Sequence, residues 1–198
     1  MVKYKFIPHT DFVQVPWKNG LGVTQEIDKL NVDGKEGFVW RLSIAAVDKD
    51  GAFSHFEGYQ RNISVLAGNG MTLDVDGKSS GVLRAFESYA FSGDADTSAV
   101  LVDGKISDFN LIYDPCFVNA KVDWCDVAEG VSSIVGAHTT VFILAGTDKT
   151  EIKIDDSIFN LGKWDVLRIK TEDCSSKLSI AAHNTAKVGI VTIQSLKP

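Results

Sequence analysis

Short turn-forming pairs recur through the first half of the chain, and they limit the length of any regular element between them. Each pair joins Asp or Asn to Gly: Asp33-Gly34, Asp50-Gly51, Asn69-Gly70, Asp76-Gly77 and Asp103-Gly104. Such pairs are the strongest short-range signal for a hairpin between two strands. Many short strands separated by turns are typical of an all-β sandwich or barrel.

The segments between the turns alternate apolar and polar residues. Residues 38–45 place Phe38, Trp40, Leu42 and Ile44 on one face of an extended segment, with Arg41 and Ser43 on the other. Residues 71–76, 151–155 and 187–193 alternate in the same way. No segment carries the period of an amphipathic helix over three turns. We therefore expect an all-β fold with little helix.

A weak internal repeat indicates two copies of one β unit. Residues 65–68 (Val-Leu-Ala-Gly) and a strand-like run after them are echoed by residues 143–146 (Ile-Leu-Ala-Gly) and a second such run. The order strand, Leu-x-Gly, turn and strand is typical of the centre of a cupin-type jelly roll. The repeat predicts a bicupin of two packed jelly-roll or β-barrel units. A boundary near Pro115 divides the chain into residues 1–114, with the expected ligand pocket, and residues 115–198.

Charge and cysteine content exclude several classes of protein. The 198 residues carry 20 Lys and Arg against 26 Asp and Glu, a net charge of −6, and no basic cluster. This disfavours nucleic acid and anionic membranes as partners. The apolar runs are far shorter than the ~20 residues of a membrane helix, and no signal peptide is visible. Three cysteines without C-x-x-C spacing favour reduced thiols, so we expect a cytoplasmic protein.

The cupin pattern can be tested for metal ligands. Counting back from Gly68 places Arg61 in the slot of the usual Glu ligand, with Glu57 and His55 in the two His slots. The same count in the second copy reaches Thr139. Because arginine is always protonated, it cannot coordinate a cation. We therefore expect neither a metal ion nor another cofactor.

Arginine is scarce, and two of the arginines lie where the alternation could direct them inward. The chain has sixteen Lys but only Arg41, Arg61, Arg84 and Arg168. An Arg61 that points inward needs a partner, because an unpaired buried charge costs several kcal/mol. One alternative is an internal carboxylate from Glu26, Glu57 or Asp108, which would make Arg61 structural. The other, which we favour, is a ligand carboxylate held by Arg61 together with Arg41, Ser43 and Asn19.

Residues 15–26 form a second dense group of polar and aromatic side chains around two glycines. They predict either a turn into an edge strand or a lid whose polar groups converge on a ligand. A phosphate loop is excluded because G-x-x-x-x-G-K is absent. With the arginine region, the candidate ligand-binding residues are Trp17, Lys18, Asn19, Thr24, Glu26, Arg41, Ser43, Phe53, Ser54, His55, Phe56, Arg61, Asp108 and Asn110.

Taken in order, these segments resemble the HutD/Ves family. The resemblance rests on the runs W-K-N-G-x-G-x-T-x-E (17–26), W-R-L-S-x-A (40–45) and G-x-F-S-x-F-x-G-x-x-R (51–61), and on G-x3-D-F-N (104–110). It covers about residues 12 to 113 strongly. It implies a two-cupin fold and a bacterial, cytoplasmic protein. Because some members are encoded with histidine-utilisation enzymes, it also implies binding of a pathway metabolite such as formylglutamate or urocanate.

Two main functions follow from these observations. The first is a non-catalytic, metal-free small-molecule binder with a regulatory role, whose pocket holds a small carboxylate. The second is a metal-free cupin enzyme, an isomerase, epimerase or hydrolase acting on a small acid or sugar, with His55, Glu26 or Asp108 as the base. A purely structural module and a homodimer also remain open. A convergent acid–base pair in the first unit would favour the enzyme, and an arginine-lined pocket without one would favour the binder.

Overall fold

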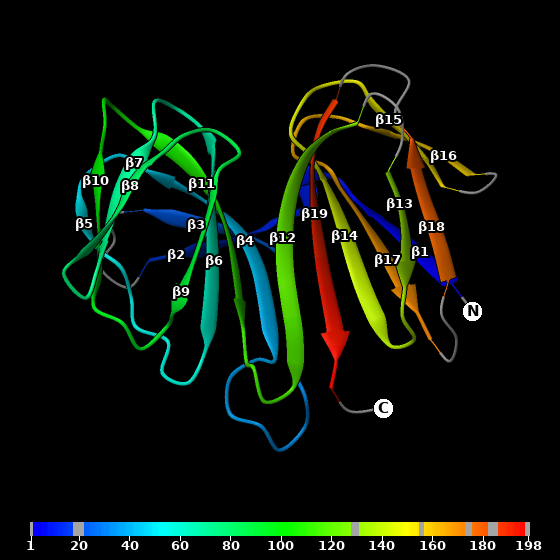
Figure 1. Ribbon diagram of the computed structural model, residues 1–198, viewed down its shortest axis with the longest axis horizontal. Coiled ribbons are helices and arrows are strands. Elements are labelled where there is room, and N and C mark those ends of the chain that lie inside the picture. Colours follow the sequence, from blue (N-terminus) through cyan, green and yellow to red (C-terminus); the bar gives the residue numbers. More distant parts are fainter. Residues whose placement is uncertain are drawn as a thin grey trace. The chain divides into compact units, whose positions relative to one another are not determined.

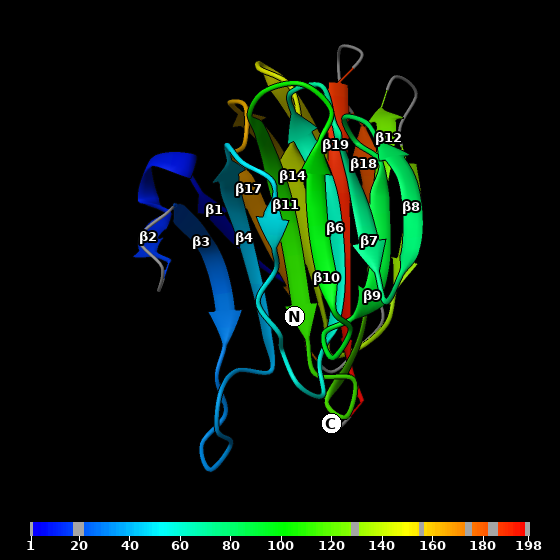
Figure 2. The same cartoon turned by 90° about the vertical axis from the view of Figure 1, so that its left-hand side faces the viewer.

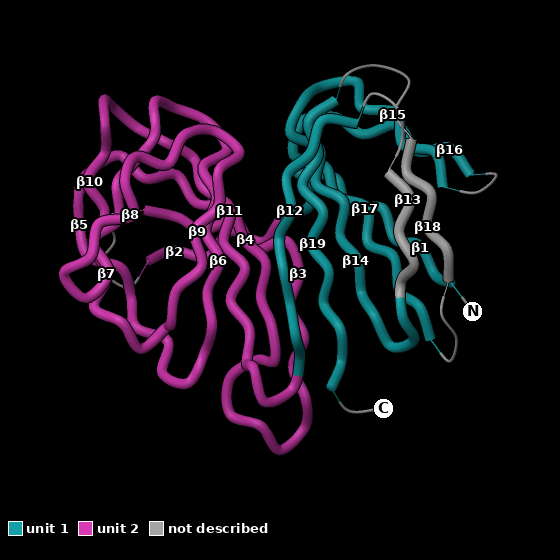
Figure 3. Tube along the Cα trace, viewed as in Figure 1, with its two compact units in different colours: residues 1–11, 118–198 teal, residues 12–117 magenta. Residues whose placement is uncertain are grey.

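The computed structural model describes residues 2–17, 22–127, 131–154, 157–172, 176–181 and 186–196. Within these ranges the chain is all β apart from a single 3-10 turn, η1 (His9–Asp11) (Figure 1). The expected all-β class is therefore confirmed. No helix in the described part of the chain is long and apolar enough to cross a membrane. The chain divides into two compact units, coloured separately in Figure 3.

The N-terminal unit comprises residues 12–117 and consists of two facing sheets. Its larger sheet has the strand order β2 (Val13–Pro16), β3 (Val23–Leu30), β4 (Trp40–Val47), β11 (Ile106–Tyr113), β6 (Gln60–Ala67) and β9 (Ser88–Ser92). Its smaller sheet has the order β5 (Gly51–Ala52), β10 (Thr97–Leu101), β7 (Met71–Val75) and β8 (Lys78–Leu83). Figure 2 shows β4, β11 and β6 from the side. Ile63 and Val65 of β6 pack with Met71 and Leu73 of β7 in the core between the sheets.

The C-terminal unit comprises residues 1–11 and 118–198. Its larger sheet has the order β1 (Val2–Ile7), β17 (Val166–Thr171), β14 (Thr139–Ala145), β19 (Ala186–Ser195) and β12 (Val118–Val127). Its smaller sheet has the order β13 (Val131–Val135), β18 (Ser176–Ala181), β15 (Thr150–Ile154) and β16 (Ser157–Leu161). Val141 and Ile143 of β14 pack with Ile152 and Ile154 of β15 in its core.

Eight strands of each unit repeat one topology, as the internal repeat predicts, whereas β2 and β3 of the N-terminal unit and β1 of the C-terminal unit have no counterpart among the described strands. The order β9-β6-β11-β4 corresponds to β17-β14-β19-β12, and β5-β10-β7-β8 corresponds to β13-β18-β15-β16. An unusual turn is repeated as well. Phe86 and Trp164 both have positive φ angles (67° and 70°). Their backbone N–H groups donate at 2.7 Å to carbonyls of β6 and β14, respectively, although the acceptors, Val65 and Ala145, are two positions apart in the alignment of Leu66 with Leu144.

The first residues of the chain belong to the C-terminal unit, which differs from the expected division into residues 1–114 and 115–198. β1 pairs antiparallel with β17 over its whole length, from Val2 opposite Thr171 to Ile7 opposite Val166. Its pairing satisfies the backbone groups on the outer edge of β17. The structural division therefore falls at Asp11 and again at Phe117.

Candidate functional site

Strand register brings the two arginines and three other polar residues to one face of the larger sheet in the N-terminal unit. Cross-strand neighbours share a face, and alternate residues along a strand do so too. In β4, β11 and β6 the rows are Arg41–Ile112–Arg61, Ser43–Asn110–Ile63 and Ala45–Asp108–Val65. Because Ile63 and Val65 lie in the core between the sheets, this face points into the unit. The predicted inward direction of both arginines is therefore confirmed.

Arg61 is connected to a buried carboxylate through an amide. Its side chain is 6% exposed, and its Nη2 donates to Asn110 Oδ1 at 2.9 Å. Asn110 Nδ2 in turn donates to Asp108 Oδ1. Arg61 Nη1 donates to the backbone carbonyl of Ser54 at 3.2 Å. Burial lowers the pKa of Arg61 to about 10, although the charge of Asp108 opposes this change.

Asp108 is the carboxylate at the end of this network, and it is only 1% exposed. Burial raises its pKa to about 7, while the nearby Arg61 charge and the Asn110 hydrogen bond act in the opposite direction. Burial disfavours the ionised form of any carboxyl group that is not fully compensated. Asp108 therefore changes its charge close to neutral pH.

Aromatic rings surround both guanidinium groups. Arg61 Cζ lies 5.2, 5.4 and 4.9 Å from the ring centroids of Phe53, Phe56 and Phe91. Arg41 Cζ lies 5.2 Å from the rings of both Phe38 and Phe56. The Nε atoms of both arginines are buried and have no hydrogen-bond partner among the described residues. Burial also lowers the pKa of Arg41, which the charge of Glu26 partly offsets.

Two of the other predicted residues, Thr24 and Glu26 of β3, lie on the same face as the arginines, opposite Ala45 and Ser43 of β4, and Trp17 packs against the core of the unit. Trp17 Nε1 donates to Thr24 Oγ1 at 2.9 Å, and Glu26 pairs with Lys29 at 3.0 Å. His55 pairs with Asp96 at 3.0 Å, where the two side chains are 56% and 90% exposed. Ser43 is buried opposite Asn110, and Ser54 contributes its backbone carbonyl to Arg61. Lys18 and Asn19 lie outside the described residues.

Among the described residues, no convergent acid–base pair is found. Within the described part of the chain, the Asp108 carboxylate hydrogen-bonds only to Asn110, while Glu26 and His55 are engaged by Lys29 and Asp96. No group of three or more His, Cys, Asp or Glu side chains that could hold a metal ion is found among the described residues. The Nε donors of the cluster's two guanidinium groups are unused among the described residues, and donors of this kind form charge-assisted hydrogen bonds with anions.

The second unit provides an internal comparison for this cluster. Counting from Leu66 and Leu144 aligns Arg61 with Thr139. Strand register then gives the remaining equivalents: Asn119 for Arg41, Thr192 for Asn110 and Ile190 for Asp108. All four equivalents are uncharged. The same topology thus forms without the charged residues, so the fold itself does not require them.

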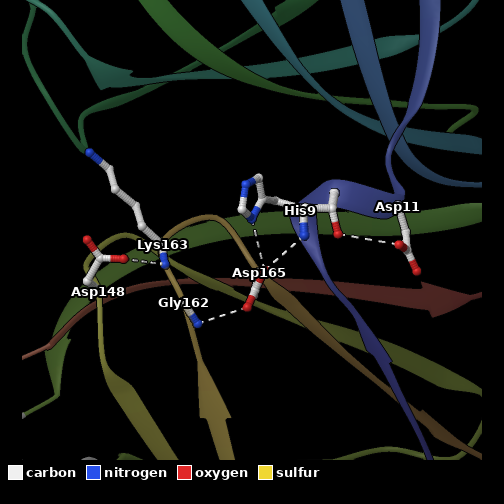
Figure 4. A network of polar contacts seen from close by, with 7 residues as sticks. His9, Asp11, Asp148, Gly162, Lys163 and Asp165 are labelled. Atoms are coloured by element: carbon white, nitrogen blue, oxygen red, sulfur yellow. Dashed lines mark hydrogen bonds and ion pairs between the residues drawn. The ribbon is translucent and has the colours of Figure 1, made fainter.

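A concave feature lies on the C-terminal unit, at residues where the sequence predicts no site. It is an open depression of about 590 Å³ lined mainly by Phe6, Pro8, His9, Lys163 and Trp164. Figure 4 shows the polar contacts beside it. Asp165 Oδ1 accepts from the backbone N–H of His9 at 2.9 Å and lies 3.3 Å from His9 Nδ1. Asp165 Oδ2 accepts from Gly162 N at 2.8 Å.

These contacts give Asp165 a structural role. In the repeated turn of the N-terminal unit, Glu87 Oε2 accepts from Arg84 N at 2.8 Å, as Asp165 does from Gly162. The bond within the turn therefore belongs to the shared fold. The additional bonds to His9 attach residues 1–11 to the C-terminal unit. No local sequence pattern connects positions so far apart.

Comparison with known proteins gives a consistent result. The HutD family model matches residues 9–189. An uncharacterised 21.2 kDa protein from the hutC 3′ region of Pseudomonas putida is 41% identical over 174 residues, covering 87% of this chain and 90% of that protein. A conserved protein of unknown function from Pseudomonas aeruginosa PAO1 has a TM-score of 0.87 and 39% identity, covering 98% of this chain and 100% of that one. HutD from Pseudomonas fluorescens SBW25, in a formate condition, has a TM-score of 0.84 and 36% identity, covering 98% and 99%.

More distant structures support the fold alone. The nickel(II) complex of a bacterial pirin from Escherichia coli has a TM-score of 0.65 at 10% identity and covers 98% of this chain and 99% of that one. Together with the duplicated topology, this likeness confirms the expected cupin-like fold.

Proposed function

The chain belongs to the HutD family, and on this premise we propose that it is a non-catalytic protein that binds a small carboxylate metabolite. Its pocket would be the metal-free interior of the N-terminal unit, with Arg61 and Arg41 as the receptors of the carboxylate. Formylglutamate and urocanate are the proposed types of ligand. The proposed role is regulatory, in the use of histidine and other amino acids in the cytoplasm.

The observation that carries this proposal is a surplus of positive charge with unused donors. Two guanidinium groups share one inward face with two carboxylates of the described residues, Asp108 and Glu26. The pKa of Asp108, about 7, leaves it partly neutral at physiological pH, and Glu26 is paired with Lys29. Both Nε atoms are buried without a partner among the described residues. A buried donor that stays unsatisfied costs about 1–3 kcal/mol. A bound carboxylate would satisfy these donors through charge-assisted hydrogen bonds.

Direct binding with matched arginine variants tests the proposal. We expect formylglutamate, urocanate or succinate to raise the melting temperature of the wild-type protein, since a ligand at a hundred times its Kd adds about 2.7 kcal/mol. Arg61→Ala is expected to lose about 2–5 kcal/mol of carboxylate binding in calorimetric titrations. Its melting temperature should stay near that of the wild type.

Arg84→Ala is the control, because Arg84 is exposed in the same unit and its loss should leave binding unchanged. A large loss of stability in Arg61→Ala without loss of binding would identify Arg61 as part of a structural network with Asn110 and Asp108. No binding of any of the three acids to the wild-type protein would contradict the proposal.

One observation favours the second candidate, a metal-free enzyme. Asp108 has a pKa of about 7 inside the cluster, and groups that titrate near the working pH are suited to proton transfer. Incubating the bound acid with the protein in heavy water, followed by NMR, separates the two functions. Deuterium incorporation or a new product that depends on Asp108 would establish the enzyme, whereas an unchanged ligand supports the binder.

A further inference from the structure

Phe56 is the one described ring that packs against both arginines of the cluster. Its centroid lies 5.2 Å from Arg41 Cζ and 5.4 Å from Arg61 Cζ. Phe38 touches only Arg41, whereas Phe53 and Phe91 touch only Arg61. Any effect of Phe56 on the cluster therefore acts on both guanidinium groups together.

The backbone of Phe56 is fixed by hydrogen bonds on both sides. Its N–H donates to Gly93 O at 2.9 Å, and its carbonyl accepts from Tyr59 N at 3.0 Å. Gly93 N donates to Tyr59 O at 2.8 Å. The approach is so close that a Cβ at Gly93 would lie 2.3 Å from Phe56 O. The rings of Phe38 and Tyr59, with centroids 6.3 and 6.4 Å away, support the Phe56 ring.

The two guanidinium groups need compensation that leaves their donors available. The charge of Arg41 acts against that of Arg61 and contributes to the lowered pKa of Arg61. No described carboxylate forms an ion pair with either group, since Asp108 is reached only through Asn110. An aromatic face attracts a cation through its quadrupole and takes up no N–H donor. A carboxylate in the same place would consume the donors that a ligand needs.

We propose that Phe56 is a positioning residue of the carboxylate site, whose ring holds the Arg41 and Arg61 guanidinium groups together with their Nε donors free. This inference rests on the proposed function. The proposed role depends on the π face of the Phe56 ring. A substitution that keeps an aromatic ring should therefore preserve binding, whereas one that keeps only an apolar side chain should weaken it.

Formate, the simplest carboxylate, is the probe, and the Nε–H resonances of Arg41 and Arg61 in proton–nitrogen NMR spectra are the readout. Phe56→Leu is expected to weaken formate binding about tenfold, because two cation–π contacts are lost. Phe56→Tyr keeps the π face and should bind formate within about twofold of the wild type. Phe117→Leu is the matched control, since Phe117 packs on Lys35 in the same unit and should not affect formate.

The Nε–H resonances also test the positioning without a ligand. Aromatic rings shift nearby protons, so both resonances should move in Phe56→Leu and stay close to the wild type in Phe56→Tyr, with melting temperatures showing that all variants are folded. Wild-type formate affinity in Phe56→Leu, or equal losses in the Leu and Tyr variants, would overturn the role of Phe56. If the wild type binds neither formate nor any of the three larger acids, the proposed function fails. Unchanged Nε–H resonances in Phe56→Leu would overturn the positioning role separately.

Discussion

The ionisation of a single side chain of the candidate site, Asp108, makes the free energy of unfolding depend on pH. Its pKa in the folded protein is about 7, against an ordinary value of 3.8. Between these two values the native state binds a proton that the unfolded chain has released. The contribution of Asp108 to the free energy of unfolding therefore falls as the pH rises from about 4 to about 7, and it stays low above that range.

Asp108→Asn should remove this dependence. The amide has the same shape, can still accept the hydrogen bond from Asn110, and carries no charge to desolvate. We expect the slope of unfolding free energy against pH to flatten in this window, with a gain on the order of a few kcal/mol above the folded-state pKa. Chemical denaturation of both proteins at several pH values measures the free energy of unfolding and its slope against pH. A slope equal to that of the wild type would show that Asp108 is ionised throughout.

At the residue scale, the sequence predicts which side chains turn inward but not how they pair. The alternation of apolar and polar residues and the position of the cupin ligand slot are sufficient to predict that Arg41 and Arg61 point inward. The partner of Arg61 depends on how β11 lies against β6, where Ile112 is opposite Arg61, Asn110 is opposite Ile63 and Asp108 is opposite Val65. A shift of one residue moves every following side chain to the other face. The Arg61–Asn110–Asp108 connection therefore becomes visible only in the folded strands.

Among the elements, the segment between β5 and β6 carries four of the predicted site residues, Phe53, Ser54, His55 and Phe56. It is held against the residues after β9 by the bonds of Phe56 and Tyr59 to Gly93. Gly93 is needed here for space, because a Cβ would meet Phe56 O at 2.3 Å and Tyr59 O at 3.0 Å. The aromatic contacts of the site thus depend on a glycine outside it.

Gly93→Ala tests this dependence. The added methyl group forces the segment to shift, at a cost of about 1–3 kcal/mol of stability, as for other overpacked sites. Formate binding should weaken in parallel, because Phe56 moves. Gly51→Ala is the control, since nothing lies within 4 Å of its Cβ position. Denaturation curves that coincide for the two variants would contradict the explanation.

Element pairing was predictable only where a pattern is repeated. The two Leu-Ala-Gly segments indicated the equivalence of β6 with β14 and the duplicated order of strands around them. β1 has no such signal. It alternates like any edge strand, and its partner β17 is set by a free sheet edge formed far along the chain. Because Ile7 and Val166 are so far apart in the chain, no local sequence pattern predicts that they pair.

For the whole molecule, duplication has produced two units with one topology and different chemistry. The interior of the N-terminal unit holds the charged cluster, whereas the equivalent positions of the C-terminal unit are uncharged. The acidic residue of the repeated turn also differs between the two units in what it binds. Its acid in the C-terminal unit, Asp165, also binds His9, and it thereby fixes residues 1–11 to that unit.

Asp165→Ala and Glu87→Ala compare these two acids directly. Loss of Asp165 leaves the N–H groups of His9 and Gly162 without an acceptor, which should cost about 1–3 kcal/mol. Loss of the exposed Glu87 should cost less than about 1 kcal/mol. Hydrogen exchange should also become faster for the β1 amides in Asp165→Ala alone. Equal costs in the two variants, or unchanged exchange of β1, would show that Asp165 does not attach the first residues.

The pairing of β1 with β17 also has a consequence for synthesis on the ribosome. β1 is translated before the N-terminal unit, but Val166, the partner of Ile7, follows about 160 residues later. At roughly 5–20 residues per second, β1 waits on the order of ten to thirty seconds for its partner. The N-terminal unit is translated completely within that delay. Docking of β1 therefore requires that β17 has been translated, and a product truncated before β17 exposes an unpaired strand to chaperones and proteases.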